Sequence, residues 1–386
     1  MKKIRVLGKG NTALAIKEKF ENAELFDDND IDIFDKASDI LTVVSPGIPP
    51  YNSLVQNTKN PISDYDLFYE NMPLSIWISG TNGKTTTTQM MQTILEEKNS
   101  VCGGNIGYAL STLDEKKDIW ILETSSFTLH YTKTAKPNIY ILLPISEDHI
   151  SWHGTYSEYK KAKLKPLQLM NENDIAIIPD EFKDIKTDAF VITYKSSDDL
   201  SEYFGIDKSK VLFNEPFLLD AILALCAKKI LFDVVDYEKI NTYKVDKHKV
   251  EEFKDKKNRL WIDDSKATNV DATINALVPY KSKNIHLILG GDDKGVSLEP
   301  LFNYLKDFDI QVYAIGANCN RVVNYCKEFN IDVDLCETLE TAVLNIDKKL
   351  KENSLGVLSP AAASLDQFSS YKDRGEQFKK FVFSLS

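Results

Sequence analysis

Short apolar runs, each followed by a polar loop rich in glycine, hydroxyl or charged residues, recur along the chain. Runs of this length without polar alternation are typical of strands buried on both faces of a parallel sheet. Between several of them, apolar residues at intervals of three and four predict helices. The sequence therefore predicts an α/β protein with open parallel sheets. The expected strands are residues 3–7, 41–44, 76–78, 118–122, 138–143, 189–194, 260–262, 285–289, 311–315 and 356–358.

The chain is long enough for two or three domains. It has 386 residues, and a domain ordinarily contains about 100–200. The elements fall into three α/β units, which we expect to span residues 1–70, 71–245 and 246–386.

A glycine-bearing loop after the strand at 76–78 is the strongest motif. Gly-Lys-Thr stands there at the change from strand to helix, where backbone N–H groups and the helix N-terminus converge on phosphate oxygens. A lysine at this point reaches β- and γ-phosphates, and the hydroxyl of the next threonine binds Mg²⁺. The alternative is a plain glycine turn. The expected contacts to a nucleoside triphosphate are Gly80, Thr81, Asn82, Gly83, Lys84, Thr85 and Thr86.

Two further strands of the central unit deliver polar residues to the same sheet edge, because the carboxyl ends of parallel strands lie together. Glu123 follows the strand at 118–122 and suits Mg²⁺, or else caps a helix or lies at the surface. His149 follows the strand at 138–143 and is either a site residue or a structural histidine.

The outer units also end their strands in polar loops. The first strand leads into a glycine turn at residues 8–13 and a helix from about residue 14; this turn either binds a ligand or is a plain tight turn. The second strand ends in the rigid segment Ser45-Pro46-Gly47, a position where open α/β sheets bind ligands. In the third unit, strand-end loops with lysines, hydroxyls and carboxylates suit an anionic ligand.

Composition excludes several kinds of partner. A net charge of −11 argues against a nucleic acid or an anionic membrane held by bulk charge. Five scattered cysteines without a Cys-x-x-Cys pair fit reduced thiols better than disulfides or a zinc site. No apolar run approaches the roughly 18 residues of a membrane span, and the first residues form no signal-peptide core. We expect a cytoplasmic protein without nucleic-acid or membrane partners.

Taken in order, the motifs resemble the Mur ligase family of bacterial cell-wall synthesis, and its D-glutamate-adding branch most closely. The shortened phosphate loop is the family's own form, and the chain lacks the Asn-Pro-Arg signature of the diaminopimelate- or lysine-adding branch. The matches are collinear over nearly the whole chain. They are Ser45-Pro46-Gly47-Ile48, Gly80-Thr81-Asn82-Gly83-Lys84-Thr85, Gly104-Asn105-Ile106-Gly107, Glu123-Thr124-Ser125-Ser126-Phe127, Glu147-Asp148-His149, Ala162-Lys163-Leu164, Asp264-Ser265-Lys266-Ala267-Thr268-Asn269, Gly290-Gly291-Asp292-Asp293-Lys294 and Ser359-Pro360-Ala361-Ala362-Ala363-Ser364-Leu365-Asp366-Gln367-Phe368.

The resemblance implies a Rossmann-like N-terminal domain for a nucleotide sugar, a central P-loop ATPase domain and a Rossmann-like C-terminal domain that closes over the site. It implies that ATP phosphorylates the carboxylate of UDP-N-acetylmuramoyl-L-alanine and that the amine of D-glutamate attacks the acyl phosphate. This reaction belongs to the peptidoglycan synthesis on which cell shape and division depend. A monomer that uses ATP and two Mg²⁺ ions is expected.

The resemblance also implies roles for particular residues. The catalytic residues would be Lys84, Glu123, His149 and Lys163. The Mg²⁺ ligands would be Thr85, Glu123, His149 and a carbamylated Lys163. ATP would be contacted from the C-terminal domain by Lys249, Asp264, Lys266 and Asn269. The nucleotide sugar would be bound by Thr12, Ser45, Pro46, Gly47, Asn105 and Ser125, with Asp27 or Asp28. D-Glutamate would be held by Thr268, Lys294, Ser364 and Tyr371.

The chain departs from the family pattern at three points. Pro216-Phe217 and Asp220 stand where a His-Asn pair with an adenine-binding Asn is usual. Lys249 stands where an Arg is usual and so lacks the planar guanidinium group, which can donate two parallel hydrogen bonds. The first domain is shorter than usual.

Two other functions stay open at this stage. One is a Mur or folylpolyglutamate-type ligase that adds a different amino acid. The other is a P-loop NTPase switch, which would hydrolyse ATP with no amino acid present.

Overall fold

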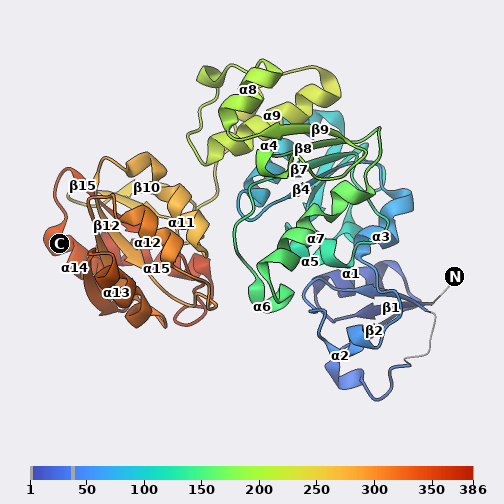
Figure 1. Cartoon of the computed structure of the whole chain (residues 1–386), viewed down its shortest axis with the longest axis horizontal. Coiled ribbons are helices and arrows are strands. Elements are labelled where there is room, and N and C mark those ends of the chain that lie inside the picture. The colour runs from blue at the N-terminus through green and yellow to red at the C-terminus, as the bar shows by residue number, and fades with distance from the viewer. Residues whose placement is uncertain (1–2, 36–39, 386) are drawn as a thin grey trace. The chain divides into compact units, whose positions relative to one another are not determined.

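The computed structural model describes residues 3–35 and 40–385, which form two compact units (Figure 1). Unit 1 comprises residues 1–213 and 217–243, and unit 2 comprises residues 214–216 and 244–386. Each unit has hydrophobic cores built from its own residues. Within the described part of the chain, no helix has the length and apolar character of a membrane span. The predicted α/β class with parallel sheets is confirmed.

Unit 1 begins with a small parallel sheet of order β2-β1-β3. Val6 and Val43 of this sheet share a core with Trp77 of the next one, so the two sheets are packed together. The helix after the first strand begins at Asn11, three residues before the predicted start, and it places Thr12 inside the helix instead of the turn. The elements are β1 (Ile4–Leu7), α1 (Asn11–Lys19), β2 (Ala23–Phe26), β3 (Leu41–Val44), α2 (Ser53–Gln56) and α3 (Asp64–Phe68).

The larger sheet of unit 1 is six-stranded and wholly parallel, in the order β5-β6-β4-β7-β8-β9. Its strands are β4 (Leu74–Ser79), β5 (Ser100–Gly104), β6 (Ile119–Glu123), β7 (Ile139–Leu142), β8 (Ile175–Pro179) and β9 (Phe190–Tyr194). Its helices are α4 (Lys84–Leu95), α5 (Ser126–Tyr131), α6 (Ile150–His153), α7 (Tyr156–Leu169), α8 (Ser197–Phe204), α9 (Phe217–Phe232) and α10 (Tyr237–Ile240).

Successive residues of β4 explain why both faces of this sheet are covered. Ile76 and Ile78 pack in one core with α4, α8 and α9, whereas Trp77 packs in the other with α5 and α7. Figure 1 shows α4 and α9 beside each other over the sheet. This arrangement leaves the carboxyl ends of the strands for loops.

Unit 2 contains a six-stranded sheet of order β10-β11-β15-β12-β13-β14. The four strands predicted for this unit run parallel to one another, and an edge strand that was not predicted, β10, pairs antiparallel with β11. Only the short turn 255–259 joins these two strands, and a parallel pair would need a long crossover. The strands are β10 (Glu251–Lys254), β11 (Leu260–Asp263), β12 (Asn284–Leu289), β13 (Ile310–Ile315), β14 (Asp332–Glu337) and β15 (Ser354–Leu358).

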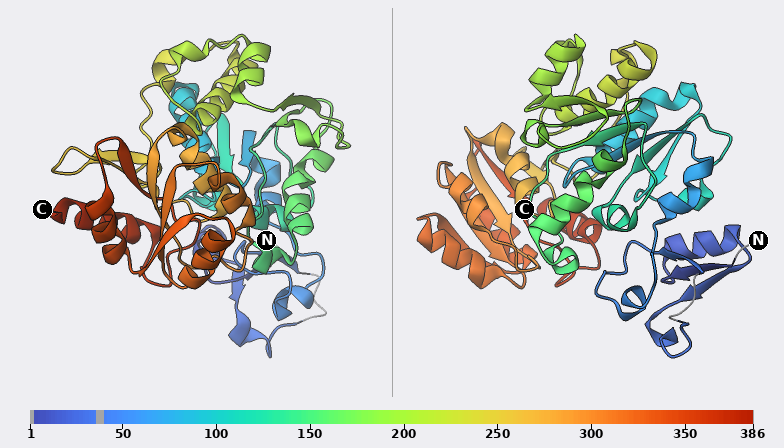
Figure 2. Two further views of the ribbon diagram at one scale, coloured as in Figure 1. Left: turned by 60° about the vertical axis from the view of Figure 1, so that its left-hand side comes forward. Right: turned by 45° about the vertical axis from the view of Figure 1, so that its right-hand side comes forward.

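Helices cover both faces of this sheet too (Figure 2). Leu287 packs with α11, α12 and α13 on one face, and Trp261 packs with α14 and α15 on the other. The helices are α11 (Val270–Leu277), α12 (Glu299–Leu305), α13 (Cys319–Glu328), α14 (Leu339–Lys349) and α15 (Tyr371–Ser384).

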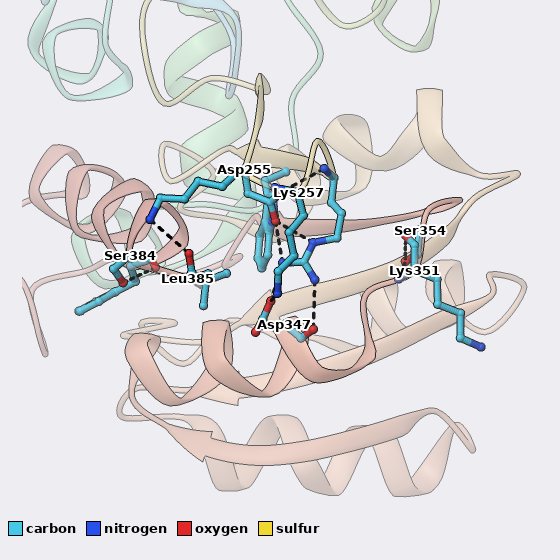
Figure 3. A network of polar contacts seen from close by, with 11 residues as sticks. Asp255, Lys257, Asp347, Lys351, Ser354, Ser384 and Leu385 are labelled. Atoms are coloured by element: carbon cyan, nitrogen blue, oxygen red, sulfur yellow. Dashed lines mark hydrogen bonds and ion pairs between the residues drawn. The ribbon is translucent and has the colours of Figure 1, made fainter.

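A polar network fastens the turn between β10 and β11 to α14 at the amino ends of the parallel strands (Figure 3). Arg259 donates through Nε to Asp255 Oδ2 at 2.8 Å and through Nη1 to the carbonyl oxygen of Asp347 at 3.1 Å. Trp261 Nε1 donates to the same Asp255 oxygen at 3.0 Å. This network lies at the amino ends of the strands, whereas the polar loops follow their carboxyl ends. It therefore stabilises the fold and is not part of the site.

Candidate active site

The predicted phosphate loop lies between β4 and α4, where the backbone needs two glycines. Gly80 and Gly83 have φ of +139° and +85°, which side-chain-bearing residues rarely adopt. A Cβ at Gly80 would also lie 2.4 Å from the Cβ of Leu143, and one at Gly83 would lie 2.6 Å from Asp220 Oδ1. The loop therefore packs tightly against its neighbours while α4 begins directly after it, at Lys84.

Lys84 is folded back onto this loop. Its Nζ donates to the carbonyl oxygens of Gly80 at 2.9 Å and Thr81 at 2.7 Å. Burial lowers the pKa of Lys84, while the charges of Glu123 and Asp148 act in the opposite direction. The ammonium group is thus held next to the backbone amides that would surround a phosphate.

Glu123 is buried at the end of β6 and is bound by two neighbours. Thr85 Oγ1 donates to Glu123 Oε2 at 2.8 Å, and Asn105 Nδ2 donates to Glu123 Oε1 at 2.6 Å. The hydroxyl and the carboxylate predicted to share Mg²⁺ therefore lie side by side. Asn105, predicted to contact the nucleotide sugar, positions this carboxylate.

Lys163 on α7 is almost completely buried beside the phosphate loop. Its Nζ donates to the carbonyl oxygen of Gly80 at 2.6 Å and lies 4.8 Å from the centre of the Tyr159 ring. Burial, and next the charge of Lys84, lower the pKa of Lys163 well below its usual value. This environment favours the neutral form of the amine over the ammonium.

His149 and Asp148 follow β7 at the same sheet edge. His149 has φ of +55° and its ring lies 4.8 Å from that of Phe127, centre to centre. Its Nε2 lies 3.7 Å from Asp148 Oδ2. Asp148 was not among the predicted site residues, although its charge acts on both Lys84 and Lys163. Its place between the strand-end Glu and His was the available signal.

A buried histidine beside this group was also missed. His153 Nε2 lies 3.0 Å from Ser126 Oγ, at the start of α5. Burial lowers the pKa of His153 to about 3, so the ring is neutral at physiological pH. Ser125, predicted to bind the nucleotide sugar, caps the same helix by accepting the N–H of Thr128 at 3.1 Å.

The first sheet brings its predicted residues to the ends of β1 and β3. Ser45 follows β3, and its Oγ is buried without a hydrogen-bond partner among the described residues. Gly8 packs against it so closely that a Cβ there would lie 2.8 Å from Ser45 Oγ. The carbonyl oxygen of Ile48, next to Pro46 and Gly47, accepts the Tyr131 hydroxyl at 2.7 Å. Asp27 caps the short helix that contains Asp28 and also pairs with Lys9.

The residues predicted to bind ATP from unit 2 lie around the end of β11. Asp264 is buried, accepts the Ser359 hydroxyl at 2.7 Å, and has its pKa raised to about 7 by burial. Asn269 caps α11 by accepting the N–H of Ala272 at 2.9 Å. Lys249 Nζ lies 3.0 Å from Asp246 Oδ2.

The residues predicted to hold the amino acid are at neighbouring strand ends of unit 2. Lys266, one of the predicted ATP contacts, lies with its Nζ 4.2 Å from the centre of the Tyr371 ring. Thr268 lies in the loop before α11, Lys294 in the loop after β12, and Ser364 in the loop after β15.

A buried arginine that the sequence analysis missed joins two of these loops. Arg374 Nη2 donates to the carbonyl oxygens of Ser265 at 2.8 Å and Ala362 at 3.0 Å. Arg374 lies inside α15, and its hydrogen-bond partners come from loops distant in the sequence. No local sequence pattern therefore indicated its role.

Known proteins are similar to this chain over nearly its full length. Residues 78–211 match the Mur ligase middle domain. The chain is 48% identical to a UDP-N-acetylmuramoylalanine–D-glutamate ligase of Campylobacter jejuni (strain RM1221), over 98% of this chain and 99% of that one. It is 43% identical to the ligase of the same name from Helicobacter pylori (strain J99), with 98% and 99% covered.

Solved structures share the fold at low sequence identity. The MurF ligase of Thermotoga maritima, solved in complex with ADP, is 17% identical and superposes with a TM-score of 0.61 over 98% of this chain and 93% of its own. The MurC ligase of the same organism is 15% identical, with a TM-score of 0.57 over 98% and 99%.

Proposed function

Because the chain belongs to the Mur ligase family, we propose that it is an ATP-dependent ligase that joins D-glutamate to UDP-N-acetylmuramoyl-L-alanine in peptidoglycan synthesis. The observation that carries the chemistry is the group formed by Lys84, Thr85 and Glu123 at the end of β4 and β6. The choice of D-glutamate rests on the relatives that match nearly the full chain. We further propose a monomer that acts in the cytoplasm.

The reaction has two steps that this geometry serves. A carboxylate oxygen of the nucleotide sugar attacks the γ-phosphorus of ATP, and ADP leaves. The D-glutamate amine then attacks the acyl carbon, loses a proton, and displaces phosphate to leave an amide. Phosphoryl transfer depends mainly on positioning and charge neutralisation. Lys84 supplies a positive charge beside the loop amides, and the loop itself orients the phosphates.

The donor set fits Mg²⁺, a hard cation that prefers oxygen ligands. Thr85 Oγ1 and Glu123 Oε2 are 2.8 Å apart and would hold one ion. His149 and a carbamate on Lys163 would hold a second. When bound, the ions neutralise charge on the transferred phosphoryl group.

Lys163 is suited to carbamylation. Burial lowers its pKa and so favours the neutral amine, whose nitrogen lone pair can bond the carbon of CO₂ with loss of one proton. The product is an anionic oxygen donor in place of a cation. This conversion explains a lysine buried within a group of phosphate and metal ligands.

Phosphate release from ATP tests the function directly. With UDP-N-acetylmuramoyl-L-alanine present, we expect release to require D-glutamate and to fail with L-glutamate. Lys84→Ala should lower the rate by at least about 10²-fold, since its charge acts on the transferring group. An exposed-lysine variant, Lys161→Ala, serves as control.

Other outcomes of this assay would change the assignment. Release that needs the nucleotide sugar but a different amino acid would indicate another ligase of the same fold. Release with neither substrate would favour an NTPase switch. Full activity of Lys84→Ala would contradict the phosphate-loop assignment.

A further inference from the structure

The loop after β12, residues 290–296, is folded tightly around Lys294. This lysine has φ of +52°, a conformation that residues other than glycine seldom adopt. Asp292 Oδ1 accepts the N–H of Lys294 at 3.0 Å, and Asp293 Oδ1 accepts the N–H of Gly295 at 2.9 Å. These two turns are exposed to solvent, so they need an anchor elsewhere to persist.

Arg321 on α13 supplies that anchor. Its Nη1 donates to Asp293 Oδ2 at 2.7 Å, and its Nη2 donates to the carbonyl oxygen of Val296 at 2.8 Å. Asn318 Nδ2 donates to the same carboxylate oxygen at 2.8 Å. Because Asp293 and Val296 lie on either side of Lys294, the planar guanidinium closes the base of the loop. The Asp293 side chain is only 11% exposed, which shields this ion pair from water.

The same loop is joined to the one that carries Ser364. Asp292 N donates to the carbonyl oxygen of Ala363 at 3.0 Å, and Ala363 N donates back to that of Asp292 at 2.8 Å. A Cβ on Gly291 would lie 2.3 Å from the oxygen of Ala363, so the two backbones are in direct contact. Any displacement of the Lys294 loop is therefore transmitted to the loop of Ser364.

We propose that Arg321 is a positioning residue for the amino-acid substrate: it holds the loop so that Lys294 is presented together with Ser364. The inference rests on the proposed function and on the prediction that Lys294 and Ser364 bind D-glutamate. A loop ordered before the substrate arrives binds it more tightly, because the entropy of ordering is already lost. The ion pair thus acts on amino-acid binding and not on ATP.

The test is steady-state kinetics of Arg321→Gln with all three substrates varied. We expect the KM for D-glutamate to rise on the order of tenfold, because the loop is misplaced. The KM values for ATP and for the nucleotide sugar should stay within about twofold, since those sites do not depend on this ion pair. Arg321→Lys should recover part of the loss, because an ammonium can reach Asp293 but cannot bond both partners.

Two further variants keep the proposal falsifiable. Lys349→Ala removes an ion pair to Asp334 and serves as control, because the Lys349 side chain is 44% exposed and that of Arg321 is 36% exposed. This variant should change none of the three KM values. Combining Arg321→Gln with Asp293→Asn should raise the KM for D-glutamate by less than the product of the two single effects, because both changes remove the ion pair between Arg321 and Asp293. Fully additive effects would overturn the proposal.

The remaining outcomes separate this inference from the function itself. An unchanged KM for D-glutamate in Arg321→Gln, or an equal rise in all three KM values, would overturn the inference and leave the ligase assignment intact. So would a Lys294→Ala variant with an unchanged KM for the amino acid. If the unmodified protein accepts a different amino acid, the proposed function is wrong. In that case, an Arg321→Gln variant with a raised KM for that amino acid and unchanged KM values for ATP and the nucleotide sugar would support the positioning role.

Discussion

At the scale of single residues, burial gives identical side chains different chemistry. Lys84 and Lys163 both donate to the carbonyl oxygen of Gly80. Burial lowers the pKa of both amines, and the charges of Glu123 and Asp148 oppose the shift at each; the pKa of Lys163 is lowered further by the charge of Lys84. One lysine is suited to a phosphate and the other to reaction with CO₂.

The proposed carbamate on Lys163 can be tested by chemical rescue. Lys163→Ala should lose at least about 10²-fold in turnover, since an anionic ligand at the reacting centre is removed. Formate or acetate should restore part of the rate by occupying the space of the carbamate. Lys161→Ala, on the same helix but exposed, should be unaffected. No rescue, together with no added CO₂ in the mass of the native protein, would indicate a plain amine.

Asp64, at the start of α3, should make stability depend on pH. Burial raises its pKa from 3.8 to about 7, and its Oδ1 has no hydrogen-bond partner among the described residues. The folded state therefore binds a proton that the unfolded state releases, so this stabilisation is present below about pH 4 and is lost as pH rises through 7.

Urea unfolding of Asp64→Asn at pH 5 and pH 8 measures this effect. From pH 5 to pH 8, the free energy of unfolding of the variant should rise relative to that of the wild type by on the order of 2 kcal/mol. Asp198→Asn, at an exposed acid, is the control. Its free energy of unfolding should differ from that of the wild type by the same amount at both pH values. A constant difference for Asp64→Asn would contradict an ionising buried carboxyl.

At the scale of elements, most interior strands were predictable, whereas several edge strands were not. The expected strands at 76–78 and 285–289 correspond to β4 and β12, which are buried on both faces. Strands β10 and β14 lie at the two edges of the sheet of unit 2 and lack an apolar run: β10 has one apolar residue, Phe253, among charged ones, and β14 alternates charged with apolar residues over most of its length. Strand β8 carries a continuous apolar run, so its signal was present in the sequence.

The network at the turn between β10 and β11 should be important for the stability of unit 2. Asp255→Ala leaves Arg259 and the Trp261 N–H without their shared acceptor. Removing one partner of such a buried pair should lower the free energy of unfolding by about 3 kcal/mol. Denaturant unfolding followed by circular dichroism measures this. Lys349→Ala, which breaks an exposed pair, should change it by less than about 1 kcal/mol; equal effects would refute the argument.

At the scale of the whole molecule, each unit has its own hydrophobic interior. The cores of unit 2 contain residues from 250 to 385 only, and its sheet is covered on both faces by its own helices. The predicted boundary at residue 70 lies within unit 1, where Val6 and Trp77 share a core.

Residues 244–386, produced alone, should therefore fold. We expect a single cooperative thermal transition and an α/β circular dichroism spectrum, because no core of this unit borrows residues from elsewhere. Trp261→Ala in the same fragment removes a completely buried side chain and should lower its stability by about 3–5 kcal/mol. A fragment without a cooperative transition would show that unit 2 depends on unit 1.

The sequence by itself determined the α/β class, the phosphate loop and most strand-end loops, because these depend on short-range patterns: apolar runs, glycines at a sharp turn, and polar residues directly after a strand. Only the tertiary structure decided which side chains meet. That Asn105 holds Glu123, that Lys163 is buried against Gly80, and that Arg321 closes the loop of Lys294 all depend on residues far apart in the chain. Burial and pKa follow from such long-range packing, which no local pattern records.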